Sequence, residues 1–189
     1  PQTKLKKNSQ KAMVKPLASK SVPVQRLDKD AEGIRASGKL PALGMAVIDA
    51  DGIWALGLAG QNHATGRPVR AQDRFHLGSN TKSMTATLVA RLVERGLLKW
   101  DTPLSALFPK LEIHPKLSSV TLEQLLRHEG GMTAWTDPTK VAGDWALFKS
   151  ETLEGVRQDR LSLAALLLKR GPNTPIGGFV YSNAGYVLV

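Results

Sequence analysis

The sequence predicts an α+β protein, in which an antiparallel sheet is covered by helices and joined to a mostly helical part. Two observations support this prediction. Short apolar runs separated by turn residues come first, between Ala42 and Phe75, and apolar residues at helical spacing follow, from Ser79 to about residue 170. Strands that precede a run of helices, instead of alternating with them, are typical of the α+β class.

The early part of this pattern predicts one helix and three strands. Residues 24–37 carry apolar residues at helical spacing, which favours a helix. Apolar runs at 42–48 and 53–59 flank the turn sequence of residues 49–52, Asp-Ala-Asp-Gly, and this arrangement indicates a β-hairpin. A third extended segment is expected to end at Phe75.

The next element is a central helix that begins at Ser79 and stops at Gly96. Its apolar residues recur at steps of three and four, so that one face of the helix is expected to be buried. The residues of this face are Met84, Leu88, Leu92 and Val93.

Three further helices are predicted after Gly96. A short one is expected between Pro103 and Pro109. The pair Thr121 and Gln124 has the spacing of a capping box, which marks the start of a second helix. A third helix is expected over 159–170, where Gly171-Pro172 provides the stop signal.

Composition and charge suggest how the chain is divided. The 189 residues are 42% hydrophobic, enough for one buried core. The net charge of +10 is concentrated at the start, where six lysines precede the first acidic residue, Asp28. These lysines are Lys4, Lys6, Lys7, Lys11, Lys15 and Lys20. We therefore expect a flexible basic leader over residues 1–23 and a single domain over residues 24–189.

The lysine leader has two interpretations, a solvated tail or a segment that contacts an anionic surface. Nucleic acid is the less favoured partner, because no aromatic residue lies between the lysines to stack on bases. The chain also lacks an apolar run long enough for a signal core or a membrane span.

The sequence gives no sign of a metal or cofactor site. There is no cysteine, which excludes disulfides, thiolate metal sites and a cysteine nucleophile. Thr81 stands where a phosphate-binding loop requires a glycine before Lys82. Met132 stands where the zinc motif begun by His128-Glu129 requires a second histidine. We therefore expect neither a metal nor a cofactor.

Ser79 and Lys82 are the first pair with a chemical interpretation. They are three residues apart at a helix start, so both side chains lie on one helix face. A serine hydroxyl must lose its proton to a neighbouring base as it attacks, and a neutral lysine can be that base. The alternative is structural, with Ser79 as the N-cap of the helix and Lys82 as a solvated side chain.

Tyr181 and Asn183 form a second pair, in a loop that follows Pro175. If this loop is extended, side chains on alternate residues point the same way. A phenol can take or relay a proton, and an amide can both donate to and accept from a substrate. The structural alternative places Tyr181 at a loop edge and makes Asn183 the cap of the next helix.

Taken together, four segments give the chain a family resemblance. They are Phe75-His76-Leu77-Gly78-Ser79-Asn80-Thr81-Lys82, residues 96–103, residues 121–131, and Tyr181-Ser182-Asn183-Ala184-Gly185-Tyr186. In this order they resemble the serine β-lactamase and penicillin-binding protein superfamily, and within it the class C β-lactamase-like branch, which also contains DD-peptidases and esterases. The superfamily carries Ser-x-x-Lys as its first motif, and this branch carries Tyr-x-Asn as its second. The implied fold is β-lactamase/transpeptidase-like.

The resemblance implies a role for each matching residue. Ser79 would be acylated, Lys82 would be its base or proton relay, and Tyr181 would be the second base. Asn183 would hold the acyl side-chain amide of a small-molecule substrate, which would be a β-lactam, an ester or a D-alanyl peptide. The backbone N–H of Ser79 would be half of an oxyanion hole. Either Lys82 or Tyr181 could take the proton. Members of this family are usually exported, which favours a periplasmic or secreted protein.

Two departures from the family pattern accompany this resemblance. The sequence His128-Glu129-Gly130-Gly131 stands where the family usually has His-Thr-Ser-Gly, and we expect this change to affect packing only. The third motif and the C-terminal strands that carry it do not occur after Tyr181. We therefore expect an N-terminal portion of a longer hydrolase, or a chain that needs a complementary C-terminal segment. The alternative is a catalytically silent binding module.

Overall fold

The structure is a computed structural model that describes residues 23–137, 139, 143–144, 146, 149–150 and 152–189. The chain divides into two compact units, one that ends at His76 and one that runs from Leu77 to Val189. The six lysines of the predicted leader lie outside the described residues, and so does any contact that they make.

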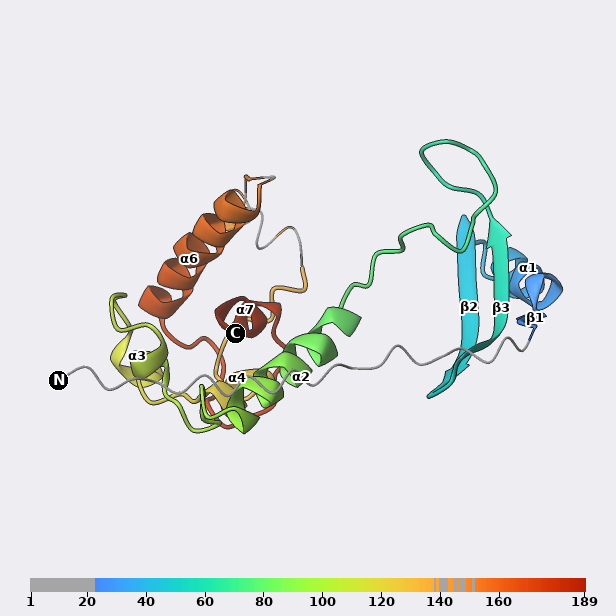
Figure 1. Ribbon diagram of the computed structural model, residues 1–189. Helices are drawn as coiled ribbons and strands as arrows, with labels where there is room; N and C mark the ends of the chain where they lie inside the picture. The colour runs from blue at the N-terminus through green and yellow to red at the C-terminus, as the bar shows by residue number, and fades with distance from the viewer. Residues whose placement is uncertain (1–22, 138, 140–142, 145, 147–148, 151) are drawn as a thin grey trace. The chain divides into compact units, whose positions relative to one another are not determined.

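The first unit contains a three-stranded sheet and one helix (Figure 1). Strands β2 (Ala42–Asp49) and β3 (Gly52–Gly60) form the predicted antiparallel hairpin, with an irregularity between Val47 and Ile48. The turn is fixed by the Asp49 carboxylate, which accepts hydrogen bonds from the N–H groups of Asp51 and Gly52. The hairpin prediction is confirmed.

The third strand is not where the sequence placed it. Instead of a segment ending at Phe75, the short strand β1 (Gln25–Arg26) pairs in parallel with β3, which gives the order β1-β3-β2. Residues 61–75 form turns and loop. Side chains satisfy part of this backbone, because Asp73 pairs with Arg67 and also accepts from the N–H of Arg70. The sheet is therefore mixed.

Helix α1 (Asp28–Ser37) begins four residues later than predicted, because the sheet recruits the residues before it. The N–H of Leu27 donates to the carbonyl of Leu56 at 3.0 Å, which continues the β1–β3 pairing. The helix lies close to the sheet at Gly57, where a Cβ atom would come within 2.7 Å of the Leu27 carbonyl oxygen. A glycine is required at that position.

The second unit is helical and contains the larger hydrophobic core. Its helices are α2 (Asn80–Glu94), α3 (Leu104–Leu107), the 3₁₀ helix η1 (Pro115–Leu117), α4 (Leu122–Leu126), α6 (Leu153–Arg170) and α7 (Asn183–Leu188). Helix α7 contacts both α4 and α6 (Figure 1). Fully buried residues at the centre of this core include Leu104, Leu117, Leu125, Leu163, Leu168 and Ala184.

Local signals set the ends of these helices. The Thr121 side chain accepts from the N–H of Gln124, and the Gln124 side chain accepts from the N–H of Thr121, which confirms the capping box. Helix α6 starts six residues before the predicted position, because Thr152 provides an N-cap that accepts from the N–H of Gly155. It ends at Gly171 as predicted.

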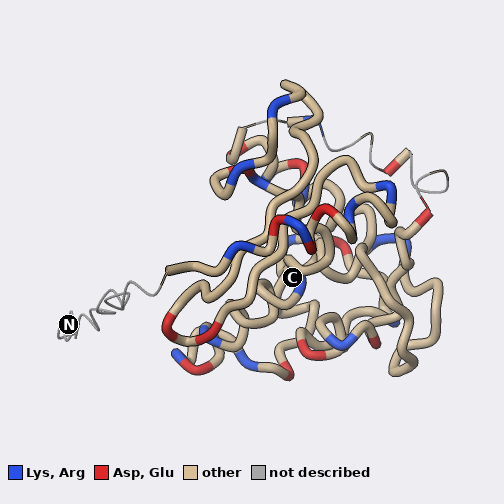
Figure 2. Tube along the Cα trace, turned by 90° about the vertical axis from the view of Figure 1, so that its right-hand side faces the viewer, with Lys and Arg blue, Asp and Glu red and all other residues tan. Residues whose placement is uncertain are grey.

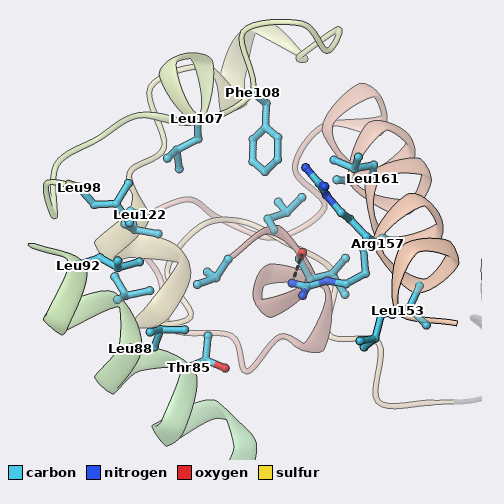
Figure 3. A pocket seen from close by; sticks show the side chains of 17 residues that line it. Thr85, Leu88, Leu92, Leu98, Leu107, Phe108, Leu122, Leu153, Arg157 and Leu161 are labelled. Atoms are coloured by element: carbon cyan, nitrogen blue, oxygen red, sulfur yellow. Dashed lines mark hydrogen bonds between the residues drawn. The ribbon is translucent and has the colours of Figure 1, made fainter.

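The predicted burial of one α2 face is wrong for part of that face. Met84 is 55% exposed and Leu88 is 60% exposed, whereas Val89 is buried. Leu88 and Leu92 instead line an open apolar hollow of about 570 Å³ between α2, α3 and α6 (Figure 3). Ser79, Lys82 and Tyr181 do not line this hollow.

Charged residues of both signs are interspersed along the described part of the chain (Figure 2). Several form surface pairs, such as Arg91 with Glu94 and Lys169 with Glu112. Surface pairs of this kind contribute about 0–1 kcal/mol each. Among the described helices, none combines the length and the apolar character needed to cross a bilayer.

Candidate active site

The start of α2 presents the two residues of the Ser-x-x-Lys motif on one face. Gly78 adopts φ 53°, a left-handed conformation that turns the chain into the helix. Ser79 follows with helical dihedral angles, and its hydroxyl makes no capping hydrogen bond. Instead, Lys82 Nζ donates to Ser79 Oγ at 3.2 Å. Ser79 therefore occupies the N-cap position of α2, but its hydroxyl does not cap the helix.

Tyr181 joins this pair from a segment about one hundred residues away. Its Oη lies 2.6 Å from Ser79 Oγ. Lys82 Nζ lies 4.8 Å from the centre of the Tyr181 ring and donates to Asn183 Oδ1 at 2.7 Å. The four residues singled out in the sequence thus form one connected hydrogen-bond network, within the unit that begins at Leu77.

The segment that carries Tyr181 is held along its length by the chain that follows α4. We call residues 128–135 the docking segment. Hydrogen bonds connect this segment to residues 176–183. The N–H of Gly177 donates to the Glu129 carbonyl at 2.8 Å, and the N–H of Val180 donates to the His128 carbonyl at 2.9 Å. Ser182 Oγ donates to the Thr133 carbonyl at 2.6 Å. These contacts hold the segment in place up to Ser182, which has extended dihedral angles, whereas Asn183 already belongs to helix α7.

Asn183 is the first residue of α7, and its amide orientation follows from its partners. Its Nδ2 donates to the Trp135 carbonyl at 2.9 Å, which leaves Oδ1 directed at Lys82. Helix α7 is capped by Ser182, whose Oγ accepts from the N–H of Gly185. Asn183 is therefore not the cap that the structural alternative proposed.

Trp135 is a residue that the sequence analysis missed. It adopts φ 50°, a region that bulky residues rarely occupy. Its Nε1 donates to Asp144 at 3.1 Å, and Asp144 pairs with Arg170 at 2.7 Å. This polar chain, which is buried at Trp135 and Asp144, holds the carbonyl that orients Asn183. No local sequence pattern connects these three positions, since α6 and the docking segment meet only in the folded chain.

His128 is the second missed residue, and it lies closer to the chemistry. The sequence analysis gave His128 no role in the site, but its ring centre is 4.6 Å from that of Tyr181. Its Nδ1 accepts from the N–H of Ser182 at 3.0 Å. The local signals were a histidine directly after a short helix, which is common in proteins, and the fact that the family pattern His-Thr-Ser-Gly begins with the same residue type.

The electrostatic environment favours an ionised phenol. The neighbouring Lys82 lowers the pKa of Tyr181 most, and the hydrogen bond with Ser79 lowers it further. Burial raises the pKa of Tyr186, whose Oη donates to the Leu126 carbonyl instead. The pKa values of the two tyrosines of the chain are thus shifted in opposite directions.

The same part of the chain offers no cluster that resembles a metal site. Among the residues that the structure describes, no three histidine, aspartate or glutamate side chains gather where they could hold a metal ion. The chemistry of the network is that of a hydroxyl, an ammonium group, a phenol and an amide. This set suits proton transfer and nucleophilic attack on a carbonyl carbon.

Comparison with known proteins identifies the family of the chain. The sequence profile of the beta-lactamase family matches residues 27–189. The chain belongs to the beta-lactamase family. It is 34% identical over 159 residues to the unguisins hydrolase of Aspergillus violaceofuscus, covering 79% of this chain and 26% of that protein. It is 40% identical over 86 residues to the esterase EstB of Burkholderia gladioli, covering 43% of this chain and 21% of that protein.

Solved structures of this family show the same fold. The octameric penicillin-binding protein homologue of Pyrococcus abyssi matches with a TM-score of 0.61 and 26% identity, covering 82% of this chain and 34% of that one. The class C beta-lactamase of Rhodobacter sphaeroides matches with a TM-score of 0.58 and 23% identity, covering 82% and 41%. The chain spans about a quarter of the length of the curated relatives described above.

The comparisons establish the β-lactamase/transpeptidase-like fold that the sequence indicated. In the part of the chain that the structure describes, β3 is the last strand of the sheet. The late strand that would carry a third motif is not among the described elements.

Proposed function

We propose that this protein is a serine hydrolase that forms an acyl-enzyme at Ser79. The observation that carries the proposal is the position of Ser79 Oγ, 2.6 Å from Tyr181 Oη and 3.2 Å from Lys82 Nζ. A hydroxyl within reach of a base, which is itself oriented by a third group, is the arrangement of an activated nucleophile. Hydrolases and esterases among the relatives support this assignment.

Tyr181 is the base in this proposal. Lys82 Nζ faces two oxygen acceptors, Ser79 Oγ and Asn183 Oδ1, which suits a protonated ammonium group that donates to both. The same positive charge lowers the pKa of Tyr181 and stabilises its phenolate.

The acylation step follows from these positions. Ser79 Oγ bonds to the carbonyl carbon of the substrate while its proton passes to Tyr181 Oη. The tetrahedral intermediate then collapses, the bond to the leaving group breaks, and the leaving group takes up the proton held by Tyr181. A water molecule later attacks the acyl carbon while Tyr181 Oη again accepts a proton. The bond between the acyl carbon and Ser79 Oγ then breaks, and Ser79 Oγ takes up the proton held by Tyr181, which releases a carboxylic acid and restores both side chains.

One donor for the developing oxyanion is supplied by the chain itself. The N–H of Ser79 precedes the first turn of α2, so no carbonyl of that helix can accept from it. The positive end of the helix dipole lies at the same place and favours negative charge there. Loss of one oxyanion donor reduces turnover by about a hundredfold to a thousandfold in a well-studied serine protease.

The substrate class is a carboxylic ester or amide, with a β-lactam or a D-alanyl peptide as specific candidates. The structural relatives include a D-amino acid amidase from Ochrobactrum anthropi and a D-stereospecific amidohydrolase from Streptomyces. The Nδ2 atom of Asn183 carries two hydrogens, and one of them is donated to the Trp135 carbonyl. The other hydrogen is available for a substrate carbonyl.

The test is covalent labelling of the full-length protein by a fluorophosphonate and by a fluorescent penicillin. We expect a single adduct on Ser79, located by peptide mass spectrometry and abolished in Ser79→Ala. Ser83→Ala is the matched control, because Ser83 lies one turn further along α2 and its Oγ donates to the Asn80 carbonyl. Reversible binding without an adduct would instead support a silent binding module.

A further inference from the structure

Both peptide neighbours of Tyr181 are attached to one residue, His128. On one side, the N–H of Val180 donates to the His128 carbonyl at 2.9 Å. On the other side, the N–H of Ser182 donates to His128 Nδ1 at 3.0 Å. The phenol ring between these two anchors lies against the imidazole, at 4.6 Å between centroids and an interplanar angle of 36°.

The backbone of His128 is set for this task. The residue adopts φ 63°, and its own N–H donates to the Leu125 carbonyl at 3.1 Å. This left-handed turn ends α4 and aims both the carbonyl and the ring at the Tyr181 segment. Asparagine and histidine are among the residues that tolerate such a conformation best.

The ring must be neutral to accept this hydrogen bond. An N–H directed at Nδ1 requires a lone pair on that atom, which leaves the ring hydrogen on Nε2. Protonation of Nδ1 would set two donors against each other at 3.0 Å and would displace Ser182. Because Ser182 is covalently bonded to both Tyr181 and Asn183, the displacement would reach the base and the amide together.

We propose that His128 is a positioning residue that holds Tyr181 Oη against Ser79, and that it does so only in its neutral form. The inference rests on the proposed acyl transfer at Ser79 and adds a group that neither the Ser-x-x-Lys nor the Tyr-x-Asn motif contains. The residue acts through Tyr181 and has no contact with the reacting oxygen of Ser79 in this assignment.

The surroundings of His128 support a neutral ring. Burial lowers the pKa of His128, and the positive charge of Lys82 lowers it further. The titratable groups that face the ring are Lys82 from α2, Tyr181 from the segment that precedes α7, and Tyr186 from α7 itself. On its own segment, Arg127 pairs with Glu129 and with Glu123.

The sign of the pH effect follows from this direction. The pKa of His128 lies below the ordinary value of 6.5, so the ring is neutral and the site intact near neutral pH. As the pH falls through the lowered pKa, the ring gains a proton and the position of Tyr181 is lost. The acylation rate therefore has an acid limb to which His128 contributes, in addition to the contribution of Tyr181 itself.

Two variants of His128 test the hydrogen-bond acceptor and the aromatic ring separately. His128→Asn keeps an acceptor for the N–H of Ser182 and tolerates the backbone angle, but it cannot be protonated. His128→Phe keeps an aromatic ring against Tyr181 and removes the acceptor. The readout is the rate of fluorophosphonate labelling at Ser79 of the full-length protein from about pH 4.5 to pH 8.5, with thermal melting of each variant to establish folding.

We expect His128→Phe to label about tenfold to a hundredfold more slowly than the wild type near pH 8, because a small displacement of a base has effects of that size. His128→Asn should stay within about threefold at that pH. Its rate relative to the wild type should then rise as the pH falls, since only the wild type loses its anchor. A ratio that is constant with pH, or a His128→Phe variant as fast as the wild type, would overturn the proposal.

A second readout does not depend on activity. Nuclear magnetic resonance of the imidazole nitrogens should show an unprotonated Nδ1 with a pKa below 6.5, and the amide signal of Ser182 should shift at the same pH. If the wild type showed this histidine titration but formed no fluorophosphonate adduct at Ser79, the proposed function would be contradicted and the positioning role would stand. If the amide signal of Ser182 did not shift as His128 titrates, only the positioning role would be contradicted.

Discussion

The two compact units of the chain differ in what stabilises them. In the unit that ends at His76, the buried apolar side chains among the described residues are Ala31, Ala55 and Ala59, which are all small. The larger apolar residues near the hairpin turn are exposed, with Val47 at 53% and Ile48 at 69%. In the unit that begins at Leu77, residues such as Leu104, Leu163 and Leu168 are completely buried.

This difference shows why the reactive network lies in the second unit. A nucleophile and its base must be held within a fraction of an ångström, and this requires side chains and backbone that cannot shift. Ser182 and Ala184, on either side of Asn183, are buried in that core. The sheet of the first unit is organised by backbone hydrogen bonds and turn residues, and the apolar side chains near its hairpin turn are exposed.

The largest expected effect comes from removing the phenol oxygen in the second unit. Tyr181→Phe should lower the rate of Ser79 acylation by about a hundredfold to ten-thousandfold, the usual contribution of a positioned general base. The measurement is the labelling rate with a fluorophosphonate at saturating concentration. Tyr186→Phe is the matched control, because its Oη donates to a backbone carbonyl and not to the Ser79 network.

If both tyrosine variants slowed labelling equally, the effect would be one of general packing and the assignment of Tyr181 as base would be wrong. The pH profile provides a further distinction. The wild-type rate should rise through an apparent pKa below the ordinary value of 10, since Lys82 and Ser79 lower the pKa of Tyr181. The residual activity of Tyr181→Phe should lack that rise.

The comparison of the two cores predicts a difference in stability. Leu168→Ala should reduce the free energy of unfolding by about 2–5 kcal/mol, because this side chain is fully buried in the core of the second unit. Val47→Ala, on the half-exposed β2, should cost less than about 1 kcal/mol. Urea denaturation followed by circular dichroism measures both. Equal losses would show that the two units are packed equally well.

Sequence signals that act over a few residues predicted the structure best. The hairpin around the turn of Asp49, the capping box of Thr121 and Gln124, and the stop at Gly171 all depend on neighbours within four positions. The placement of Ser79 and Lys82 on one face of α2 has the same origin. Such features are decided by backbone geometry and short-range hydrogen bonds, which a single sequence records.

The errors involve contacts between distant segments. Strand β1 formed at Gln25–Arg26, where β3 provided a partner, and not near Phe75. His128 and Trp135 entered the site because the docking segment lies beside residues 176–183. The family resemblance brought Tyr181 to Ser79, but periodicity alone could not have done so. Exposure of Leu88 was also missed, since helical spacing indicates a face without identifying what covers it.

A smaller effect is expected at the start of α4, which leads into the docking segment. Thr121→Ala removes the acceptor for the N–H of Gln124 and should cost about 0.5–2 kcal/mol of stability, the usual effect of losing a helix cap. Thr121→Ser keeps the hydroxyl and serves as the control. Because α4 ends just before His128, we expect Thr121→Ala to slow acylation slightly, and an increase in rate would contradict this coupling.

The smallest effect concerns the first unit, where a charge pair closes the loop after β3. The Arg67 guanidinium lowers the pKa of the Asp73 carboxyl to about 2, and the N–H of Arg70 assists. Because the folded pKa lies below the unfolded value, the pair stabilises the loop above about pH 4, and this contribution disappears as the pH falls towards 2.

Arg67→Gln should return the Asp73 pKa towards its ordinary value, while Arg74→Gln, at an exposed neighbouring position, should leave it low. Carboxyl carbon shifts in a nuclear magnetic resonance titration measure this directly. An unchanged Asp73 pKa in Arg67→Gln would mean that backbone N–H groups, and not the ion pair, organise the loop. The first unit would then depend on backbone hydrogen bonds even more than its small buried side chains suggest.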